Sequence, residues 1–252
     1  MKHLRIAFDR RGFLGLVAGA AASAAAAAPS TALAAAGGGD AQLKIATIGA
    51  GHEGGALGTL FAKQGHPVMF SSRHPDELKA LVASAGPTAQ AGTIEQAVKF
   101  GDVILLVVPY TAVEQIGKDY GQTLAKKELV FDVSNPIPRR DGDAIVNWVA
   151  EQGGAGLATA KLLPGAHLVR AFNAINFLKL IAGARRSGEP LGIPIASDDP
   201  KAEALASKLI KEIGFEPVPV GGLAMGKYLV PGTPLAGEHT PAEIRQIVTT
   251  LK

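Results

Sequence analysis

Short apolar runs alternate with polar, helix-forming segments along most of the chain. Each run ends at glycine, proline or a small polar residue, and the run at 102–108 is almost uninterrupted, as expected of a parallel strand covered on both faces. The predicted strands are 43–48, 67–70, 102–108, 128–133, 168–172 and 193–196, and the predicted helices are 55–64, 76–85, 93–100, 143–152, 176–183 and 200–213. This alternation predicts an α/β fold with a doubly wound parallel sheet.

The turn after the first predicted strand is rich in glycine. Its residues are Gly49, Ala50, Gly51, His52, Glu53 and Gly54. In a dinucleotide-binding Rossmann unit, Gly49 makes the tight turn, Gly51 lets the backbone approach a pyrophosphate, and Gly54 lets the helix pack closely on the strand. The pyrophosphate lies at the helix N-terminus, where free N–H groups point at it. The six residues are therefore predicted to bind a nucleotide cofactor.

Two residues of this turn are open to more than one interpretation. His52 is a donor to a phosphate or simply a turn residue. Glu53 falls in the first turn of the helix, where its charge suits the helix dipole, but it opposes a nearby phosphate unless it points away.

The residues after the second predicted strand distinguish between the two dinucleotides. An NAD site usually has Asp or Glu there, and a carboxylate would repel a 2'-phosphate. This chain has Ser71, Ser72 and Arg73 instead, with no acid before Asp76. Hydroxyl donors and a permanently charged guanidinium suit a phosphate. The predicted cofactor is therefore NADP.

The first 36 residues differ in composition from the rest. The sequence Asp9-Arg10-Arg11-Gly12-Phe13-Leu14-Gly15 resembles a twin-arginine export signal, and an uncharged stretch dominated by alanine follows it. Alanine favours membrane insertion much less than leucine, so no stable membrane span is expected. The prediction is a signal peptide at 1–36 that engages the twin-arginine export machinery, and hence a periplasmic or extracellular protein.

The rest of the chain divides into a joint at 37–42, an NADP-binding Rossmann domain at 43–185 and a small C-terminal α/β lobe at 186–252. The signal carries four of the 25 basic and one of the 22 acidic residues, which leaves 21 of each. The basic character of the chain therefore belongs to the signal and gives no support for nucleic-acid binding. With no cysteine, a disulfide, a cysteine nucleophile and a thiolate metal site are excluded.

Six segments together resemble the NADP-dependent deazaflavin (coenzyme F420) oxidoreductase family. They are IGAGHEGGALG at 48–58, SSRHP at 71–75, VVPY at 107–110, FDVSNP at 131–136, VRAFNAI at 169–175 and LVPGTPLAG at 229–237. The resemblance implies hydride transfer between NADP(H) and a flavin-like or deazaflavin co-substrate. It places Val108, Pro109 and Tyr110 along the cofactor. It also places Asn135, Pro136, Ala171 and Asn173 beside the acceptor cleft.

No catalytic residue is assigned from the sequence, because hydride transfer mainly requires two rings held together away from water. No metal site is expected. The leading hypothesis is an NADPH-dependent oxidoreductase with a small-molecule electron acceptor, and a homodimer is a candidate assembly. Two alternatives stay open: an imine, keto-acid or pyrroline-type reductase, and a non-catalytic NADP-binding sensor or subunit of a redox complex.

Overall fold

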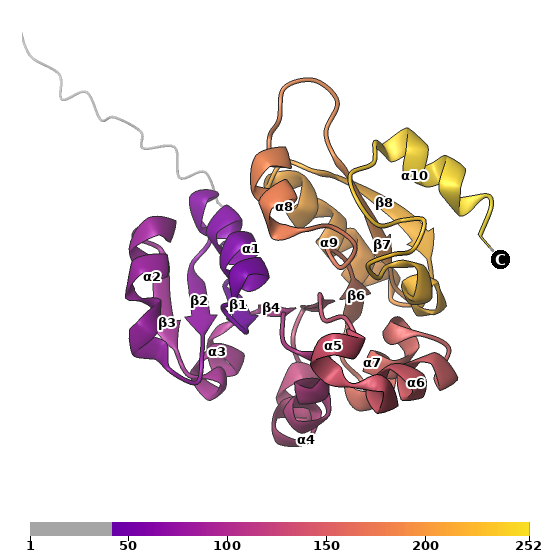
Figure 1. The fold of residues 1–252 in the computed structure, drawn as a ribbon. Helices are drawn as coiled ribbons and strands as arrows, with labels where there is room; N and C mark the ends of the chain where they lie inside the picture. Colours follow the sequence, from indigo (N-terminus) through magenta and orange to yellow (C-terminus); the bar gives the residue numbers. More distant parts are fainter. Residues whose placement is uncertain (1–41, 252) are drawn as a thin grey trace, which may run out of the picture. The chain divides into compact units, whose positions relative to one another are not determined.

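The computed structural model describes residues 42–251. Its strands are β1 (Ile45–Ile48), β2 (Val68–Ser71), β3 (Ala89–Gly92), β4 (Val103–Leu106), β5 (Leu129–Asp132), β6 (Leu168–Arg170), β7 (Gly192–Ala196) and β8 (Glu216–Gly221). They form one sheet in the order β3-β2-β1-β4-β5-β6-β7-β8, parallel except where β6 meets β7 (Figure 1). The chain moves outward from β1 in one direction and then restarts at β4 on the other side. The predicted doubly wound α/β fold is thus confirmed.

Helices cover both faces of this sheet. They are α1 (His52–Lys63), α2 (Lys79–Ala85), α3 (Ile94–Phe100), α4 (Val113–Leu124), α5 (Pro138–Asp141), α6 (Asp143–Glu151), α7 (Ala155–Leu162), α8 (Phe177–Gly183), α9 (Pro200–Glu212) and α10 (Pro241–Val248). The strand β4 shows why two cores form. Its residues Val103 and Leu105 pack with α1, α8 and α9, whereas Ile104 and Leu106 pack with α3, α4 and α7. Successive side chains of a strand point to opposite faces, so both faces of β4 are apolar and buried.

Some elements differ from the sequence prediction. The helix α1 begins at His52 rather than at residue 55, because Gly51 has extended backbone angles and serves as the N-cap. The strands β3 and β8 were not predicted. The predicted signal at 1–36 and all of the joint at 37–42 except Gln42 lie outside the described residues. The boundary predicted at 186 stays a prediction, and β7 and β8 beyond it continue the same sheet.

A capping box fixes the start of α3. The hydroxyl of Thr93 accepts a hydrogen bond from the backbone N–H of Gln96 (3.2 Å), and the Gln96 side chain accepts one from the Thr93 N–H (2.8 Å). Replacing Thr93 with alanine is expected to lower the free energy of unfolding by about 1 kcal/mol, because one N–H at the helix end loses its partner. Urea unfolding followed by circular dichroism measures this. The control Thr111→Ala, at an exposed position, should stay within about 0.5 kcal/mol of the wild type; an equal loss in both variants would contradict the capping role.

Candidate functional site

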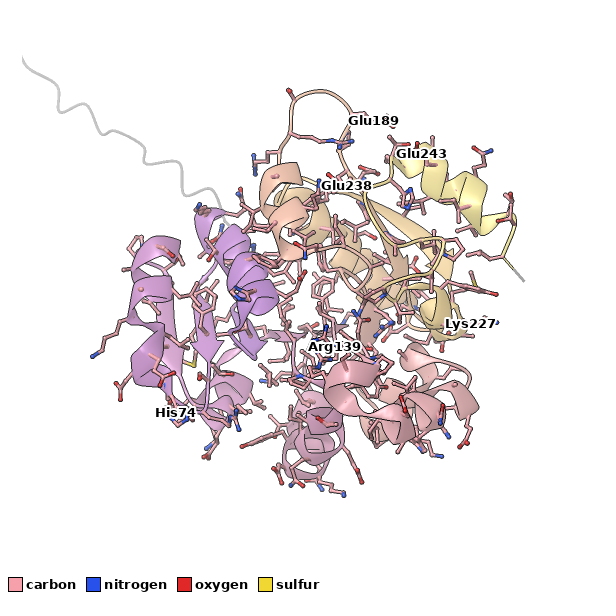
Figure 2. The ribbon with its side chains drawn as sticks, in the orientation of Figure 1. His74, Arg139, Glu189, Lys227, Glu238 and Glu243 are labelled. Atoms are coloured by element: carbon pink, nitrogen blue, oxygen red, sulfur yellow. The ribbon has the colours of Figure 1, made fainter. Side chains whose placement is uncertain are left out.

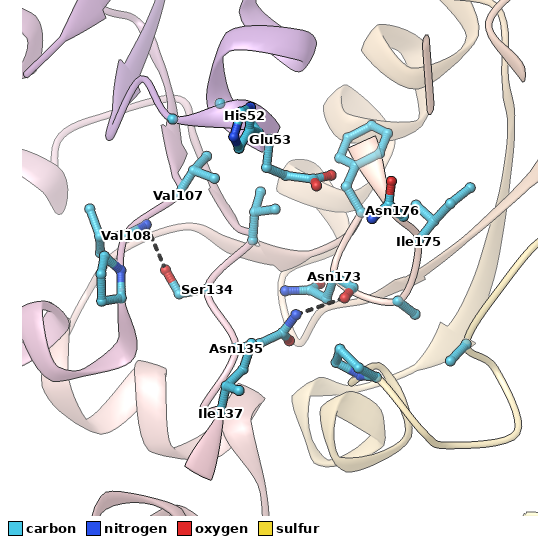
Figure 3. Close-up of a pocket in the computed structure, with 18 of the residues that line it drawn as sticks. His52, Glu53, Val107, Val108, Ser134, Asn135, Ile137, Asn173, Ile175 and Asn176 are labelled. Atoms are coloured by element: carbon cyan, nitrogen blue, oxygen red, sulfur yellow. Dashed lines mark hydrogen bonds between the residues drawn. The ribbon is translucent and has the colours of Figure 1, made fainter. Parts of the chain in front are cut away.

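A pocket of about 600 Å³ opens at the carboxyl ends of the strands, between the glycine turn and the segments that follow β4, β5 and β6 (Figure 3). It lies where the strand order reverses between β1 and β4, the place where open α/β sheets bind ligands. The residues that line it are Gly51, His52, Glu53, Gly54, Val107, Val108, Pro109, Val133, Ser134, Asn135, Ile137, Arg140, Phe172, Asn173, Ala174, Ile175, Asn176, Pro231, Gly232, Ala236 and Gly237.

The glycine turn is shaped for a close backbone approach. A Cβ on Gly54 would lie 2.0 Å from the carbonyl oxygen of Gly49, and a Cβ on Gly49 would lie 2.2 Å from the carbonyl oxygen of Val107. Gly49 also has a φ of 98°, which side chains rarely allow. A Cβ on Gly51 would instead meet nothing within 4 Å, so open space lies beside the start of α1. No side chain caps that helix end. The residues present therefore fit a pyrophosphate bound by backbone N–H groups.

The end of β2 lies beside this turn. The backbone N–H of Ala50 donates to the carbonyl oxygen of Ser71 (3.0 Å). The Ser71 hydroxyl is buried and donates to the Thr47 carbonyl (2.6 Å), so it holds the strands together rather than facing a ligand. The hydroxyl of Ser72 accepts from the His74 N–H (3.0 Å). The guanidinium of Arg73 is exposed and has no hydrogen bond or ion pair with residues 42–251, so it is free to bind an anion at this end of the turn.

The glycine turn contacts the start of α8 at the edge of the pocket. The ring of His52 stacks on Phe177, with centroids 4.9 Å apart and planes 14° apart. The carboxyl of Glu53 extends from α1 toward the start of α8 (Figure 3). Burial raises the pKa of Glu53 to about 7, although a hydrogen bond from the Phe177 backbone lowers it. Glu53 Oε1 is buried and has no hydrogen-bond partner among the described residues.

The opposite wall is built on a buried guanidinium. Arg170, at the end of β6, is fully buried and donates from Nη1 to Asp132 Oδ2 (2.8 Å) and to the Ser134 carbonyl (2.8 Å). From Nη2 it donates to Asn135 Oδ1 (2.7 Å) and to the Leu229 carbonyl (3.1 Å). Arg170 thus fixes the segment after β5 and the beginning of the C-terminal segment that closes the pocket.

Amide side chains complete this wall. Asn135 donates to the Asn173 carbonyl (2.7 Å), and Asn173 donates to the Asp132 carbonyl (2.8 Å). The Ser134 hydroxyl accepts from the Val108 N–H (3.3 Å), as Figure 3 shows. Asn173 is buried, and its Oδ1 has no partner among residues 42–251. Glu53 and Asn173 thus both line the pocket, and each has a buried oxygen without a hydrogen-bond partner among the described residues.

Seven of the predicted site residues line the pocket: Gly51, His52, Glu53, Gly54, Val108, Pro109 and Asn135. Asn173, which the resemblance placed beside the acceptor cleft, lines it as well. Gly49 and Ala50 form the turn next to it, and Ser71, Ser72 and Arg73 follow the adjacent strand.

Three predicted residues lie outside the pocket wall. Tyr110 is buried among α4 and α7, and its hydroxyl is hydrogen-bonded to Thr159 (3.0 Å) and to the Ala155 carbonyl (3.3 Å). Burial raises the pKa of this hydroxyl. Ala171 is fully buried in the core on the α9 face. Pro136 does not contribute to the lining either. The turn that follows Pro109 directs Tyr110 into the core, so its predicted contact with the cofactor is wrong for this structure.

The structure adds wall residues that sequence reasoning did not assign. Residues 231–237 return to the pocket from beyond β8, held by the bond from the Gly237 N–H to the Ala174 carbonyl (2.7 Å). Arg140 also reaches the pocket, and its neighbour Arg139, labelled in Figure 2, is exposed. Arg140 is bonded to Asp141 (2.9 Å) and to the Asn135 carbonyl (2.5 Å). The resemblance to LVPGTPLAG was the signal available for residues 231–237.

Two kinds of feature are missing from residues 42–251. No helix there is long and apolar enough to cross a membrane. No group of three or more His, Asp or Glu side chains is placed to hold a metal ion in that part of the chain.

Comparison with known proteins gives one family match. Residues 44–136 match the family described as "NADP oxidoreductase coenzyme F420-dependent". The metalloreductase STEAP3 of Rattus norvegicus is 29% identical over 187 residues, which cover 73% of this chain and 35% of that protein. The chain spans about a third of the length of the curated relatives that it matches.

Two solved structures have a similar fold. A hypothetical protein, SMa0349, from Sinorhizobium meliloti has a TM-score of 0.67 at 26% identity, covering 79% of this chain and 96% of that one. A putative F420-dependent NADP reductase from Arthrobacter sp. FB24 has a TM-score of 0.61 at 18% identity, covering 73% and 87%. Residues 44–136, which carry the glycine turn, the end of β2 and the pocket wall after β4 and β5, are thus the part of the chain that matches the family of coenzyme F420-dependent NADP oxidoreductases.

Proposed function

We propose that this protein is an NADPH-dependent oxidoreductase that transfers a hydride between NADP(H) and a flavin-like, deazaflavin or other small electron acceptor. The observation that carries the proposal is the pocket at the switch point, which runs from the open space beside Gly51 to the residues after β5 and β6. Cofactor chemistry of this kind needs a protein that binds two rings side by side and keeps water away.

The two ends of the site suggest how a bound dinucleotide is oriented. The pyrophosphate belongs at the start of α1, and the adenosine half belongs toward the end of β2, where Arg73 is free to pair with a 2'-phosphate. The nicotinamide half then extends into the pocket, between Glu53 on one side and Asn135 and Asn173 on the other. When bound, NADP(H) supplies the hydride chemistry, and the protein supplies its position and a mostly apolar wall.

The acceptor belongs in the same pocket, beside the nicotinamide. The wall formed by Ile137, Phe172 and Ile175 is apolar and suits a flat ring, while Glu53 and Asn173 add polar side chains to it. These features support a flavin-like or deazaflavin acceptor. An imine or keto acid is a smaller alternative for the same space.

Replacing Arg73 with alanine tests the nucleotide assignment. Loss of the guanidinium is expected to weaken NADPH binding about tenfold, or about 1.4 kcal/mol, because a charge-assisted bond to the 2'-phosphate is lost at an exposed site. NADH lacks that phosphate, so its affinity should not change. Fluorescence titration of both nucleotides measures the difference.

Arg245→Ala, on the exposed side of α10, is the matched control and should bind NADPH as the wild type does. An Arg73 variant that still prefers NADPH as strongly as the wild type would contradict the assigned 2'-phosphate site. If the wild type binds neither nucleotide, the oxidoreductase proposal fails. Tight NADPH binding without hydride transfer to any acceptor would favour the sensor or redox-subunit alternative.

Export through the twin-arginine machinery, a periplasmic or extracellular location and a homodimer stay predictions. The residues on which the export prediction rests, 1–36, lie outside the described part of the chain.

A further inference from the structure

We propose that Glu53 is the acid of this pocket, which donates to the acceptor the proton that accompanies the hydride. The inference rests on the proposed function and extends it, because it restricts the acceptor to a molecule that takes up a hydride at one atom and a proton at a nitrogen or oxygen. It also gives a catalytic role to a residue of the glycine turn that the sequence assigned only to cofactor binding.

The position of Glu53 is the first reason. Its side chain leaves the first turn of α1 and extends away from the end of β2, toward Asn176 and the start of α8 (Figure 3). That is the nicotinamide side of the pyrophosphate position. Among the residues that line the pocket, Glu53 is the one with a carboxyl group.

The hydrogen bonding of the carboxyl is the second reason. A carboxylate accepts several hydrogen bonds, but here the Phe177 backbone is the donor that stabilises it, and Oε1 is buried without a partner. A neutral carboxylic acid needs fewer donors and has an O–H group to offer. The unpartnered oxygen is therefore better suited to carry a proton toward a ligand than to carry a negative charge.

The surrounding charges do not compensate the carboxylate. The other titratable groups that line the pocket are His52 and Arg140. The ring of His52 is exposed and stacked on Phe177, and Arg140 forms an ion pair with Asp141. On α8, Lys179 is exposed and paired with Glu238, and on α2 the nearest cation, Lys79, is exposed. The strands β1, β2 and β4 present no charged side chain to α1. Burial therefore dominates and raises the pKa of Glu53 to about 7, a value suited to a general acid near neutral pH.

The acceptor takes a hydride, which is one hydrogen nucleus with two electrons, from C4 of the reduced nicotinamide and a proton from the Glu53 carboxyl. The acceptor leaves with two added hydrogens and two added electrons, and NADP⁺ and the Glu53 carboxylate remain. The carboxylate then regains its proton from solvent.

The test compares the full-length protein with Glu53→Gln in two measurements. The first is proton uptake on adding NADPH at pH 8 in weakly buffered solution with an indicator dye. Free Glu53 is mostly ionised at that pH, and burial by the nicotinamide half together with the negative charge of the nucleotide should raise its pKa, so the wild type is expected to take up close to one proton per bound NADPH. The glutamine variant should bind NADPH with an affinity within about threefold of the wild type, because it keeps the shape and the acceptor for the Phe177 N–H, yet take up no proton.

The second measurement is single-turnover oxidation of bound NADPH by FMN, a 5-deazaflavin and a cyclic imine. The wild-type rate is expected to hold at pH 8 and to fall as pH rises above about 9, because bound NADPH keeps Glu53 protonated until then, and the variant should be about 10²-fold to 10⁴-fold slower without that fall. Glu151→Gln, an exposed change at the end of α6, should match the wild type in both measurements.

Four outcomes overturn the inference. They are a wild type that takes up no proton, equal uptake in the wild type and Glu53→Gln, an unchanged rate and pH profile in Glu53→Gln, and proton uptake by a wild type that then reduces none of the acceptors. Equal rates in the wild type and Glu53→Gln would show that Glu53 has only a structural role between α1 and α8. Failure of the wild type to bind NADPH is a separate result, which rejects the proposed function itself.

Discussion

Replacing Arg170 with methionine is expected to lower the free energy of unfolding by about 3–5 kcal/mol. The guanidinium is fully buried and bonded to Asp132 (2.8 Å), so its removal leaves a buried carboxylate without its counter-ion. Burial raises the pKa of Asp132 and Arg170 opposes that rise, so the pKa should be raised further in the variant. When the pKa of a carboxyl is higher in the folded state than in the unfolded state, the folded state becomes less stable as pH rises and the carboxyl ionises. The deficit of the variant should therefore shrink on acidification, which urea unfolding at a series of pH values measures.

Two further variants sharpen this test. Asp132→Asn combined with Arg170→Met should recover part of the loss, since the unpaired charge is gone. Arg139→Met, at an exposed position of α5 labelled in Figure 2, should stay within about 0.5 kcal/mol of the wild type. An Arg170→Met protein as stable as the wild type at pH 8 would show that the pair is not needed to compensate Asp132.

Replacing Gly54 with alanine is expected to weaken NADPH binding about 5-fold to 150-fold and to destabilise the fold by about 1–3 kcal/mol. The added methyl group would lie 2.0 Å from the Gly49 carbonyl oxygen, so α1 must move away from the turn that it completes. Unfolding and NADPH titration on the same preparation measure the two effects together.

Gly51→Ala separates the two effects. Its methyl group meets no protein atom within 4 Å and its backbone angles suit alanine, so the loss of stability should stay below about 1 kcal/mol, the usual cost of alanine at an N-cap position. The same methyl group occupies the space assigned to the pyrophosphate, so NADPH binding should weaken. If Gly51→Ala binds NADPH as tightly as the wild type, the phosphates do not lie where the turn places them.

The sequence predicted the elements whose pattern is strong. The runs of β1, β4 and β5 are mostly apolar, and the structure buries every residue of these strands. The strands β3 and β8 were missed because both are edge strands with partly exposed residues, and β8 contains Pro217 and Pro219. Proline is tolerated on an edge, where a missing N–H breaks no ladder, but in a sequence it argues against a strand.

The candidate site was predictable where residues act close to their own strand. The glycine turn lies at the pocket because the turn geometry follows from the residues themselves. The contribution of residues 231–237 depends on how the end of the chain folds back, which no local pattern encodes. Tyr110 follows two residues that line the pocket, yet its own side chain points into the core, because the turn after Pro109 sets its direction.

The pocket wall is assembled from segments that lie far apart in the chain, from the glycine turn at 51–54 to the closing segment at 231–237. A ribosome must therefore add about 180 residues after the turn before the wall is complete, which takes roughly 10–40 s at about 5–20 residues per second. Before then the nascent chain contains the glycine turn but lacks the segment that completes the pocket. Nucleotide capture in the cell thus comes only after residue 237 has been added, and a chain that stalls before that point has no complete site.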